Sequence, residues 1–553
     1  MAFDEIGRLA RTLWHVPPHA LAWRVWARIK RVFYMSPFYG LAALQGEDTV
    51  APVWVGPDLV PGDAGKGAAM AKGTFAFAGE AFELGIPPRT WTPAKASALW
   101  QFTMHYHEWL ADMRAAGARE EAQRVVEDWL VRFGHYHPVA WHPYPLSLRV
   151  AAWLTHGGWL LEGAPDDTRK AFYEVLHRQA VYLAGNCEYD LGGNHLLKNL
   201  KALIYAGFAW DDLRPLREKA LATLLREVPK QILPDGGHYE RSSLYQAQVV
   251  RDLLDIRALL RKAGGNMTPL DAAVRRAGTA LAFFRYPDGG LGLWNDADEG
   301  RAEEITQLIR LSGAEEPPVM LPESGYARLA RGPMLVLMDG GRVGPDENPG
   351  HAHADMLAFE MVWHGARVIV NQGTFAYQHR LRNAFRGTSA HSTVSVDGKD
   401  SAEVWAAFRV GRRPRNVDLR VQGDAKAGDI VVEGHHDGYR HLGARHRRKL
   451  VMAADGSRLR GEDEVNFPRA GKNRVMAHFH LHPDVQVRLL SESEAKLTLG
   501  DGKVLTVSVD GGRLDVRDSR YAPQFGVMKA AKQLVIHGRL KGHTCRMDWQ
   551  IFG

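Results

Sequence analysis

Two imidazoles and a carboxylate alternate in the segment Gly350-His-Ala-His-Ala-Asp355, which leads into an apolar run. This alternation predicts a strand, on which His351, His353 and Asp355 would project from one face. Such a set suits a metal, zinc in particular, if a neighbouring strand supplies a further ligand, for which His391 is the natural candidate. The alternative is a neutral, hydrogen-bonded polar row inside a sandwich. Nearby, the arginines of residues 380–386 could clamp carboxylates or sulfates.

A second group of polar residues follows two glycines. Asn194 and His195 come directly after Gly192-Gly193 and should open a helix. Free N–H groups and the positive end of the helix dipole favour an anionic group at such a place. The alternative is that Asn194 only caps the helix.

A third group surrounds the turn that begins at Asp235-Gly-Gly. It delivers His238, Glu240, Arg241 and Tyr245 near the start of a long helix. A purely structural turn would need only its glycines, so this convergence of polar groups predicts a site.

Composition restricts the class of protein. The 553 residues are 45% hydrophobic and 24% charged, which is typical of a soluble globular chain. The net charge of +7 suits a polyanionic ligand, but no basic tract indicates nucleic acid. Two cysteines cannot build a disulfide framework or a four-cysteine zinc site. No Gly-x-Ser-x-Gly elbow, Walker loop or dinucleotide fingerprint is present.

No apolar run approaches the roughly 18 residues of a membrane-spanning helix. The first residues lack the bases and apolar stretch of a secretory signal. We therefore expect a cytoplasmic protein, with the periplasm as the alternative.

Helical periodicity dominates up to about residue 310. Leu21, Val25, Ile29 and Val32 share one helix face beside several basic residues. This helix could lie on a membrane surface, but we interpret it as a docked N-terminal helix. Residues 34–92 should form an irregular, partly β connection. The further helices are predicted at 94–116, 118–133, 145–162, 167–184, 194–208, 211–228, 241–263 and 269–285. Short gaps make neighbouring helices antiparallel, which indicates a toroid or solenoid.

Period-two patterns and tight turns replace the helices after Pro317. Strands are predicted at 334–338, 356–363, 366–370, 393–396, 430–433, 474–481, 496–499, 505–509 and 534–537. A long β-rich stretch without helices indicates an antiparallel sandwich. We predict an α+β multidomain protein, with a helical toroid over residues 1–315 and a β-sandwich over 316–553.

The same segments resemble the heparinase II/III-like polysaccharide lyases. The resemblance lies in residues 193–199, 235–245, 350–355, 368–374 and 386–393, with weaker likeness at 99–106 and 141–149. It implies an incomplete (α/α) toroid followed by an antiparallel sandwich. It also implies β-elimination from an acidic polysaccharide or oligosaccharide that contains uronic acid.

The resemblance implies roles for individual residues. Asn194 matches the amide that neutralises the uronate carboxylate, and His195 lies beside it. Tyr245 matches the general base or acid, and His351 the histidine that assists neutralisation or serves as base. Because a phenol is a poor base at a pKa of about 10, we expect Arg241 or Arg386 to lower that pKa. We assign substrate binding to Trp141, Arg149, His238, Glu240, Arg241 and Arg386.

A structural zinc is also implied, held by His353, Asn371 and His391. The family pattern has an aspartate where this chain has Asn371, and an amide oxygen is a weaker zinc ligand than a carboxylate.

Two other hypotheses remain open. A glycoside hydrolase would need two carboxylic acids, for which Glu188, Asp190, Asp235 and Glu240 are available. A non-catalytic carbohydrate-binding or assembly protein could instead use Trp100, Trp141 and Tyr144 to stack on sugar rings. The residues do not define the uronic acid, its linkage or the oligomeric state.

Overall fold

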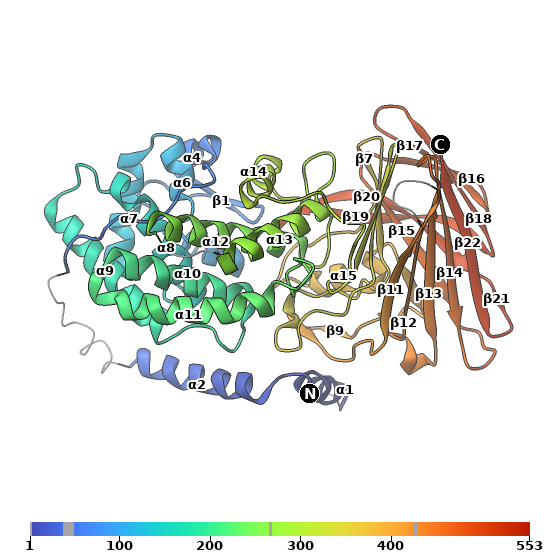
Figure 1. The fold of residues 1–553 in the computed structure, drawn as a ribbon, viewed down its shortest axis with the longest axis horizontal. Coiled ribbons are helices and arrows are strands. Elements are labelled where there is room, and N and C mark those ends of the chain that lie inside the picture. Colours follow the sequence, from blue (N-terminus) through green and yellow to red (C-terminus); the bar gives the residue numbers. More distant parts are fainter. Residues whose placement is uncertain (1–2, 37–48, 265–267, 424–427) are drawn as a thin grey trace. The chain divides into compact units, whose positions relative to one another are not determined.

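The computed structural model describes residues 3–36, 49–264, 268–423 and 428–553 (Figure 1). The chain forms two compact units. The helical unit comprises residues 16–231 and 248–274, and the sandwich unit comprises residues 1–15, 232–247 and 275–553. The predicted boundary at residue 315 stays a prediction.

The helical unit is built from antiparallel helices joined by short loops. Its main helices are α7 (Arg119–Phe133), α8 (Pro143–Leu160), α9 (Asp166–Ala184), α10 (Gly193–Ala209) and α11 (Arg214–Gln231). α12 (Ser243–Lys262) and α13 (Thr268–Phe284) each contribute residues to both units. α8 and α10 are buried on nearly all sides, so they form the centre of this unit. Helices that are apolar around most of their circumference are expected in such a position.

The predicted helix over 94–116 is interrupted. It forms α5 (Ala98–Met104) and α6 (Leu110–Ala115), because the chain turns between them and His107 adopts a positive φ of 56°. A helix cannot continue through a left-handed residue. Four helices among the described residues were not predicted: α1 (Phe3–Leu13), α4 (Ala64–Ala71), α14 (Ala302–Ser312) and α15 (Arg382–Arg386).

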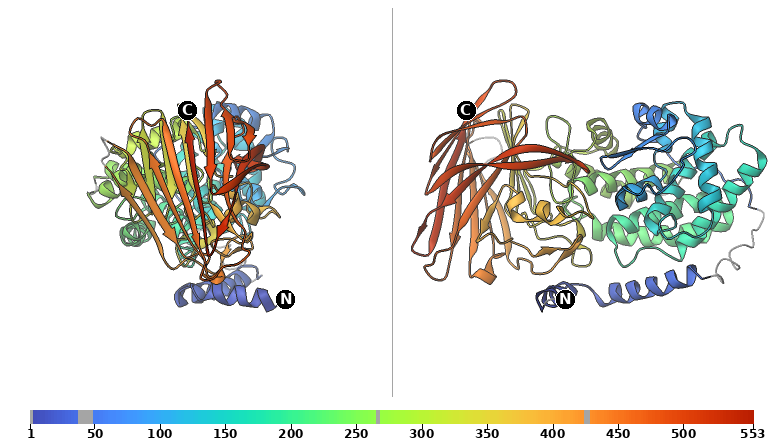
Figure 2. Two further views of the ribbon diagram at one scale, coloured as in Figure 1. Left: turned by 90° about the vertical axis from the view of Figure 1, so that its right-hand side faces the viewer. Right: turned by 180° about the vertical axis from the view of Figure 1, so that it is seen from behind.

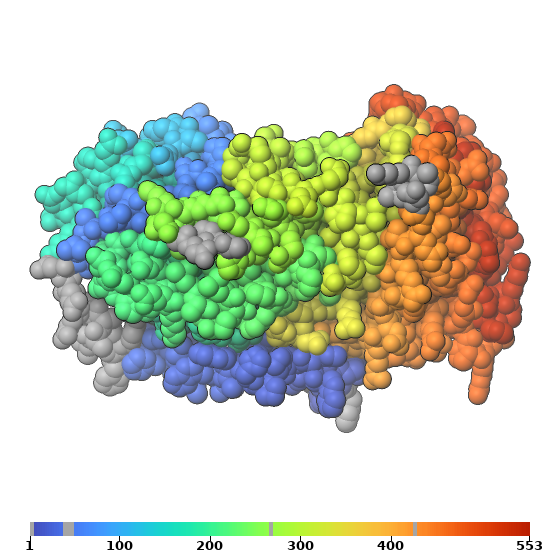
Figure 3. All heavy atoms as spheres, viewed as in Figure 1, coloured from blue at the N-terminus to red at the C-terminus, as the bar shows by residue number. Residues whose placement is uncertain are grey.

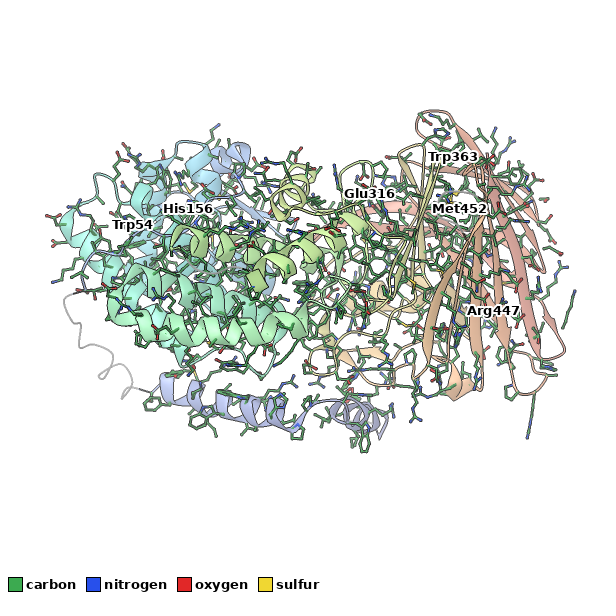
Figure 4. The ribbon with its side chains drawn as sticks, viewed as in Figure 1. Trp54, His156, Glu316, Trp363, Arg447 and Met452 are labelled. Atoms are coloured by element: carbon green, nitrogen blue, oxygen red, sulfur yellow. The ribbon has the colours of Figure 1, made fainter. Side chains whose placement is uncertain are left out.

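The connection before α5 is partly β, as predicted. β1 (Thr74–Phe77) and β2 (Glu80–Glu83) pair as a hairpin. Trp54, labelled in Figure 4, forms no strand. Its ring lies so close to α8 that a Cβ on Gly157 would come within 2.3 Å of it. Residues 37–48 of this predicted connection lie outside the described residues.

The sandwich unit stacks two antiparallel sheets, which Figure 2 shows from two further sides. In spatial order, one sheet runs β11 (Val417–Gln422), β12 (Ile430–His436), β13 (Arg445–Met452), β14 (Arg458–Asn466), β22 (Thr544–Phe552), β18 (Val504–Asp510), β17 (Glu494–Thr498) and β16 (Gln486–Ser491). The other runs β19 (Gly512–Gln524), β20 (Val527–Gly538), β15 (Val475–Leu481), β7 (Ala366–Val370), β6 (Phe359–Trp363), β5 (Met334–Asp339), β4 (Tyr326–Arg331) and β3 (Met320–Leu321). At the sides of these sheets, β21 (Leu540–Lys541) pairs with β22 and β8 (Val394–Val396) pairs with β15. The predicted architecture of helices followed by an antiparallel sandwich is confirmed.

Apolar side chains from both sheets meet between them. Trp363 of β6 and Met452 of β13, both labelled in Figure 4, belong to this one core. Phe359 stacks on Trp549 with ring centroids 5.3 Å apart. This core supports the loops at the sheet edge that carry the candidate site.

Among the described residues, no helix combines the length and apolarity that crossing a bilayer would require.

Candidate active site

Asp296 is the centre of a buried cluster in the sandwich unit. Its side chain has no exposed surface and accepts hydrogen bonds from four residues. Nδ1 of His351 lies 3.0 Å from Oδ2, and Nε2 of His353 lies 2.9 Å from Oδ1. Arg382 donates through both terminal nitrogens, and Thr374 donates from its hydroxyl. One carboxylate therefore fixes two histidines and one arginine.

The charge of Asp296 is secured by these donors. Burial alone would raise its pKa, but the Arg382 guanidinium and the hydrogen bonds from His351 and His353 hold that pKa well below its usual range. A permanently ionised Asp296 requires His351 to carry its proton on Nδ1. The opposite nitrogen, Nε2, then has its lone pair available as a base. Nε2 lies 3.7 Å from the Glu240 carboxylate.

Tyr245 is brought to this cluster by the start of α12. The Ser242 hydroxyl accepts from the Tyr245 backbone N–H and donates to the Asp296 carbonyl at 2.5 Å. Ser243 donates to the Gly292 carbonyl at 2.6 Å. These two serines bind the first turn of α12 to the irregular segment of residues 292–296. The Tyr245 ring consequently lies 4.0 Å from the His351 ring, centroid to centroid.

The phenol of Tyr245 is held in its protonated form. Its hydroxyl is 2.7 Å from the hydroxyl of Tyr377. Burial, followed by the neighbouring Tyr377 and Asp296, raises the Tyr245 pKa well above 10. The expectation that an arginine lowers this pKa is wrong in this structure, because the largest effect on the phenol is desolvation. At neutral pH the phenol of Tyr245 can therefore donate a proton.

The segment 350–355 is not the predicted strand. Residues Pro349–His351 form a 3-10 turn, and β6 begins only at Phe359. The Arg386 side chain donates to the Ala352 carbonyl, and the Asn295 side chain accepts from the His353 N–H. These contacts hold the segment in a curled path instead of an extended one. His351 and His353 nevertheless converge, because both reach Asp296. Asp355 is also buried, and burial together with the neighbouring Asp355 carboxylate raises the pKa of Asp339.

The three residues expected to hold zinc fit that ion poorly. Nδ1 of His353 lies 3.2 Å from Nε2 of His391, a distance that one N–H···N hydrogen bond explains. Burial lowers the pKa of both imidazoles, that of His353 to about 4, so the pair is neutral. Oδ1 of Asn371 already accepts from the Ser392 N–H at 3.1 Å. Among the described residues, no group of three His, Cys, Asp or Glu side chains could hold a metal. The neutral, hydrogen-bonded alternative describes this pair better.

The other residues of the sandwich unit expected to bind substrate are largely enclosed. His238 and Glu240 are buried, and burial lowers the His238 pKa to about 4. Arg241 donates to the carbonyls of Ser324 and Arg342. The Arg241 donors are thus used by backbone carbonyls, and the buried Glu240 carboxylate lies beside His351.

Arg386 is fully buried and donates twice to the Ala352 carbonyl. Arg382 of the same stretch is committed to Asp296. The expectation that residues 380–386 clamp an anion is therefore corrected for these two arginines, which fix the loop of His351 and His353 from inside.

The helical unit holds a second polar cluster around His195. Nδ1 of His195 lies 3.0 Å from Oε1 of Glu188, and the Tyr144 ring lies 4.3 Å from the His195 ring. Asn199 donates to the other Glu188 oxygen at 3.2 Å. His195 is partly exposed, with 24% of its side chain accessible. The carboxylate orients this imidazole as Asp296 orients His351.

Asn194 is not the helix cap. The N-cap of α10 is Gly192, which has a positive φ of 61° and makes no side-chain cap. Asn194 lies inside the first turn and is fully buried. The capping alternative is wrong, and the two glycines explain why Asn194 faces inward at a helix start.

Three aromatic and cationic residues of the helical unit are too deep to contact a polymer. Trp100 and Trp141 are buried, and the Trp141 indole donates to the Phe133 carbonyl. Arg149 is fully buried, where it donates to Gln179 and to two carbonyls. The expectation of direct sugar contact is corrected for them, because their donors are used inside the unit. Tyr144 is half-buried and remains accessible beside His195.

Asp296 and Tyr377 were missed by the sequence analysis. Asp296 follows a glycine-rich apolar run, and Tyr377 stands alone six residues after Asn371. Neither belongs to a periodic pattern. Asp296 could have been suspected only as an acid in Trp294-Asn-Asp-Ala297, where polar residues interrupt an apolar segment.

Comparisons with known proteins agree with this architecture. The model described as heparinase II/III N-terminus matches residues 88–312, and the one described as heparinase II/III-like, C-terminal, matches residues 314–550. The chain is 27% identical over 519 residues to FtsZ-localized protein C of Caulobacter vibrioides, with 89% of each chain covered. It is 22% identical over 378 residues to heparin-sulfate lyase of Pedobacter heparinus, covering 60% of this chain and 56% of the lyase.

Solved structures share the fold. The crystal structure of heparinase III superposes with a TM-score of 0.70 at 18% identity, covering 84% of this chain and 79% of the other. Heparan sulfate lyase from Pedobacter heparinus superposes with a TM-score of 0.57 at 17% identity, covering 90% and 84%. With both family models spanning most of its length, this chain belongs to the heparinase II/III family and has a polysaccharide-lyase-like scaffold.

Proposed function

We propose that the protein is a polysaccharide lyase that cleaves a uronic-acid-containing polymer by β-elimination. The observation that supports this most directly is the pairing of His351 with Tyr245. An imidazole oriented by a buried carboxylate lies against a phenol that burial keeps protonated. One group can remove a proton while the other supplies one, as elimination requires.

In the proposed reaction, Nε2 of His351 takes the proton from C5 of the uronate. The C5–H electron pair forms the double bond between C4 and C5, and the C4–O bond breaks. The leaving glycosidic oxygen takes the phenolic proton of Tyr245. Water is not consumed, and the acid and base are restored when the two residues exchange protons with solvent.

The C5 proton becomes acidic only when the uronate carboxylate is neutralised. The family resemblance assigns this role to Asn194, with His195 beside it. Asn194 is fully buried and the His195 side chain is 24% exposed, so in this proposal His195 contacts the carboxylate and Asn194 supports it from the first turn of α10. Replacing Asn194 with Leu should therefore lower turnover much more than it lowers polymer binding.

A panel of uronate polymers tests the proposal. The wild-type protein should generate an ultraviolet-absorbing unsaturated sugar end on at least one polymer, and His351→Ala should abolish this signal. A wild-type protein that produces no such absorbance across the panel would count against elimination.

The similarity to FtsZ-localized protein C favours a second candidate. On this hypothesis the protein binds carbohydrate or helps to assemble a polysaccharide, and its polar clusters bind sugar without cleaving it. Retained binding of a uronate polymer to the wild-type protein, measured by calorimetry, with no product by mass spectrometry, would select this candidate.

A further inference from the structure

α2 (Pro18–Tyr34) has one face docked on the helical unit. The Tyr34 hydroxyl accepts from the Asn186 amide at 3.0 Å, and the Trp23 ring lies 5.3 Å from the Tyr189 ring. Lys30 donates to the Gly185 carbonyl at 2.5 Å. The predicted docked helix is thus confirmed, and these contacts fix which face of α2 turns outward.

The outward face of α2 is apolar. The exposed fractions are 56% for Val25, 51% for Trp26, 55% for Ile29 and 67% for Val32. At 100° per residue these four side chains fall within one arc of the helix. A surface helix of a soluble protein normally places polar residues there. α2 lies on the molecular surface in Figure 3, where its residues are drawn in blue.

This exposure is concentrated near the N-terminal end of the chain. Of the twenty exposed large hydrophobic side chains among the described residues, ten lie between residues 6 and 35. α1 (Phe3–Leu13), in the sandwich unit, independently exposes Ile6, Leu9 and Leu13, and Trp14 follows it with 88% exposure. Each of these two helices by itself exposes large apolar side chains, and exposed apolar groups of this kind mark an interaction surface.

The charges of α2 identify the partner's chemistry. Arg24, Arg28, Lys30 and Arg31 are its charged residues, and the helix contains no acid. In the helical projection, Arg28 and Lys30 fall on opposite sides of the apolar arc, each about 100° from Ile29. An apolar stripe bordered by bases, with a tryptophan within it, is the pattern of a helix that lies in a bilayer interface.

We propose that α2 is a peripheral membrane anchor that inserts Val25, Trp26, Ile29 and Val32 among the lipids of an anionic bilayer. Arg28, which is exposed, lies at the level of the headgroups, where it meets phosphate. The inference is independent of the lyase chemistry, because none of these residues belongs to either polar cluster.

Vesicle sedimentation with the full chain tests this anchor. Vesicles of phosphatidylcholine that also contain phosphatidylglycerol should carry the wild-type protein into the pellet. Vesicles of pure phosphatidylcholine should carry down much less of the protein. The double variant Ile29→Glu, Val32→Glu should lose binding at least about tenfold, because two charges would enter the interface. Arg28→Ala should weaken binding about fivefold, the worth of one base near an anionic surface.

Val131→Glu is the matched control, since Val131 on α7 is 84% exposed in the same unit. It should bind vesicles as the wild type does, and all variants should keep the wild-type thermal midpoint. A wild-type protein that stays in the supernatant with anionic vesicles would overturn the anchor. Equal loss for Val131→Glu, or equal binding to both vesicle types, would also overturn it.

Discussion

Replacing Asp296 with Asn should separate the chemistry of the cluster from its packing. The side chain keeps its shape but loses its charge, and one oxygen becomes an NH₂ group that faces donors. Arg382, whose side chain is 3% exposed, would lose the carboxylate with which it forms its ion pair. Removing one partner of a buried ion pair costs about 3–5 kcal/mol, and we expect the free energy of unfolding to fall by an amount in that range.

Activity should fall for a different reason. An amide offers one accepting oxygen where the carboxylate offers two, so it would no longer enforce the form of His351 that carries its proton on Nδ1. We expect turnover to fall by about 10²–10⁴-fold, the usual contribution of a positioned acid–base group. Substrate affinity should change little, because Asp296 has no exposed surface.

Asp463→Asn provides a matched control in the sandwich core. Asp463 is as buried as Asp296 and accepts from Arg448, His446 and the Trp549 indole. Its replacement should cost similar stability but leave turnover of the folded protein near normal. Both variants would be compared by thermal unfolding and by product formation at a temperature well below either midpoint.

Two results would refute the reasoning. Near-normal turnover in Asp296→Asn would show that His351 needs no carboxylate. An equal loss of turnover in Asp463→Asn would show that destabilisation alone explains the effect. If Asp296→Asn fails to fold, His351→Gln tests the same base, because Asp296 then keeps its bond to Arg382.

Three further outcomes are expected. Tyr245→Phe should lower turnover about 10²–10⁴-fold in a product assay, while the lost hydroxyl costs about 0.5–1.5 kcal/mol of unfolding free energy. Metal analysis should find less than one zinc per chain, and a chelator should leave the thermal midpoint unchanged; one full equivalent would contradict our assignment of a hydrogen-bonded histidine pair. Burial lowers the pKa of His238 and His478 to about 4 and that of His480 to about 3. Below about pH 6.5 the unfolded chain takes up protons at these histidines and the folded chain does not, so the free energy of unfolding should fall between about pH 6.5 and pH 4. Asp355 partly offsets this loss, because burial raises its pKa to about 7. A flat thermal midpoint across that range would contradict this.

The sandwich was predictable where alternation and turns coincide. Leu505–Val509 lies between two Asp/Gly turns, and it forms β18 with alternate residues buried. The long strands β19 and β20 were largely missed, because their mixed exposure hides the period of two. An alternation of apolar and polar residues indicates a strand only when one face of the strand is buried and the other is exposed.

The site was predictable in its members more than in its geometry. His351 and His353 converge as expected, but through Asp296 and a curled segment instead of a strand face. Burial could not be read from residue type, so Arg149 and Arg386 were taken for ligand-binding cations. Their partners are backbone carbonyls distant in sequence, which leave no local signal.

Cleavage in water enriched in heavy oxygen tests the central claim most directly. Products of the best polymer in the panel would be analysed by mass spectrometry. Elimination predicts an unsaturated end and no heavy oxygen beyond the exchange that the same reducing ends show when they are incubated in this water without enzyme, because no water adds across the broken bond. One heavy oxygen in the new reducing end, with both fragments saturated, would show hydrolysis and contradict the account.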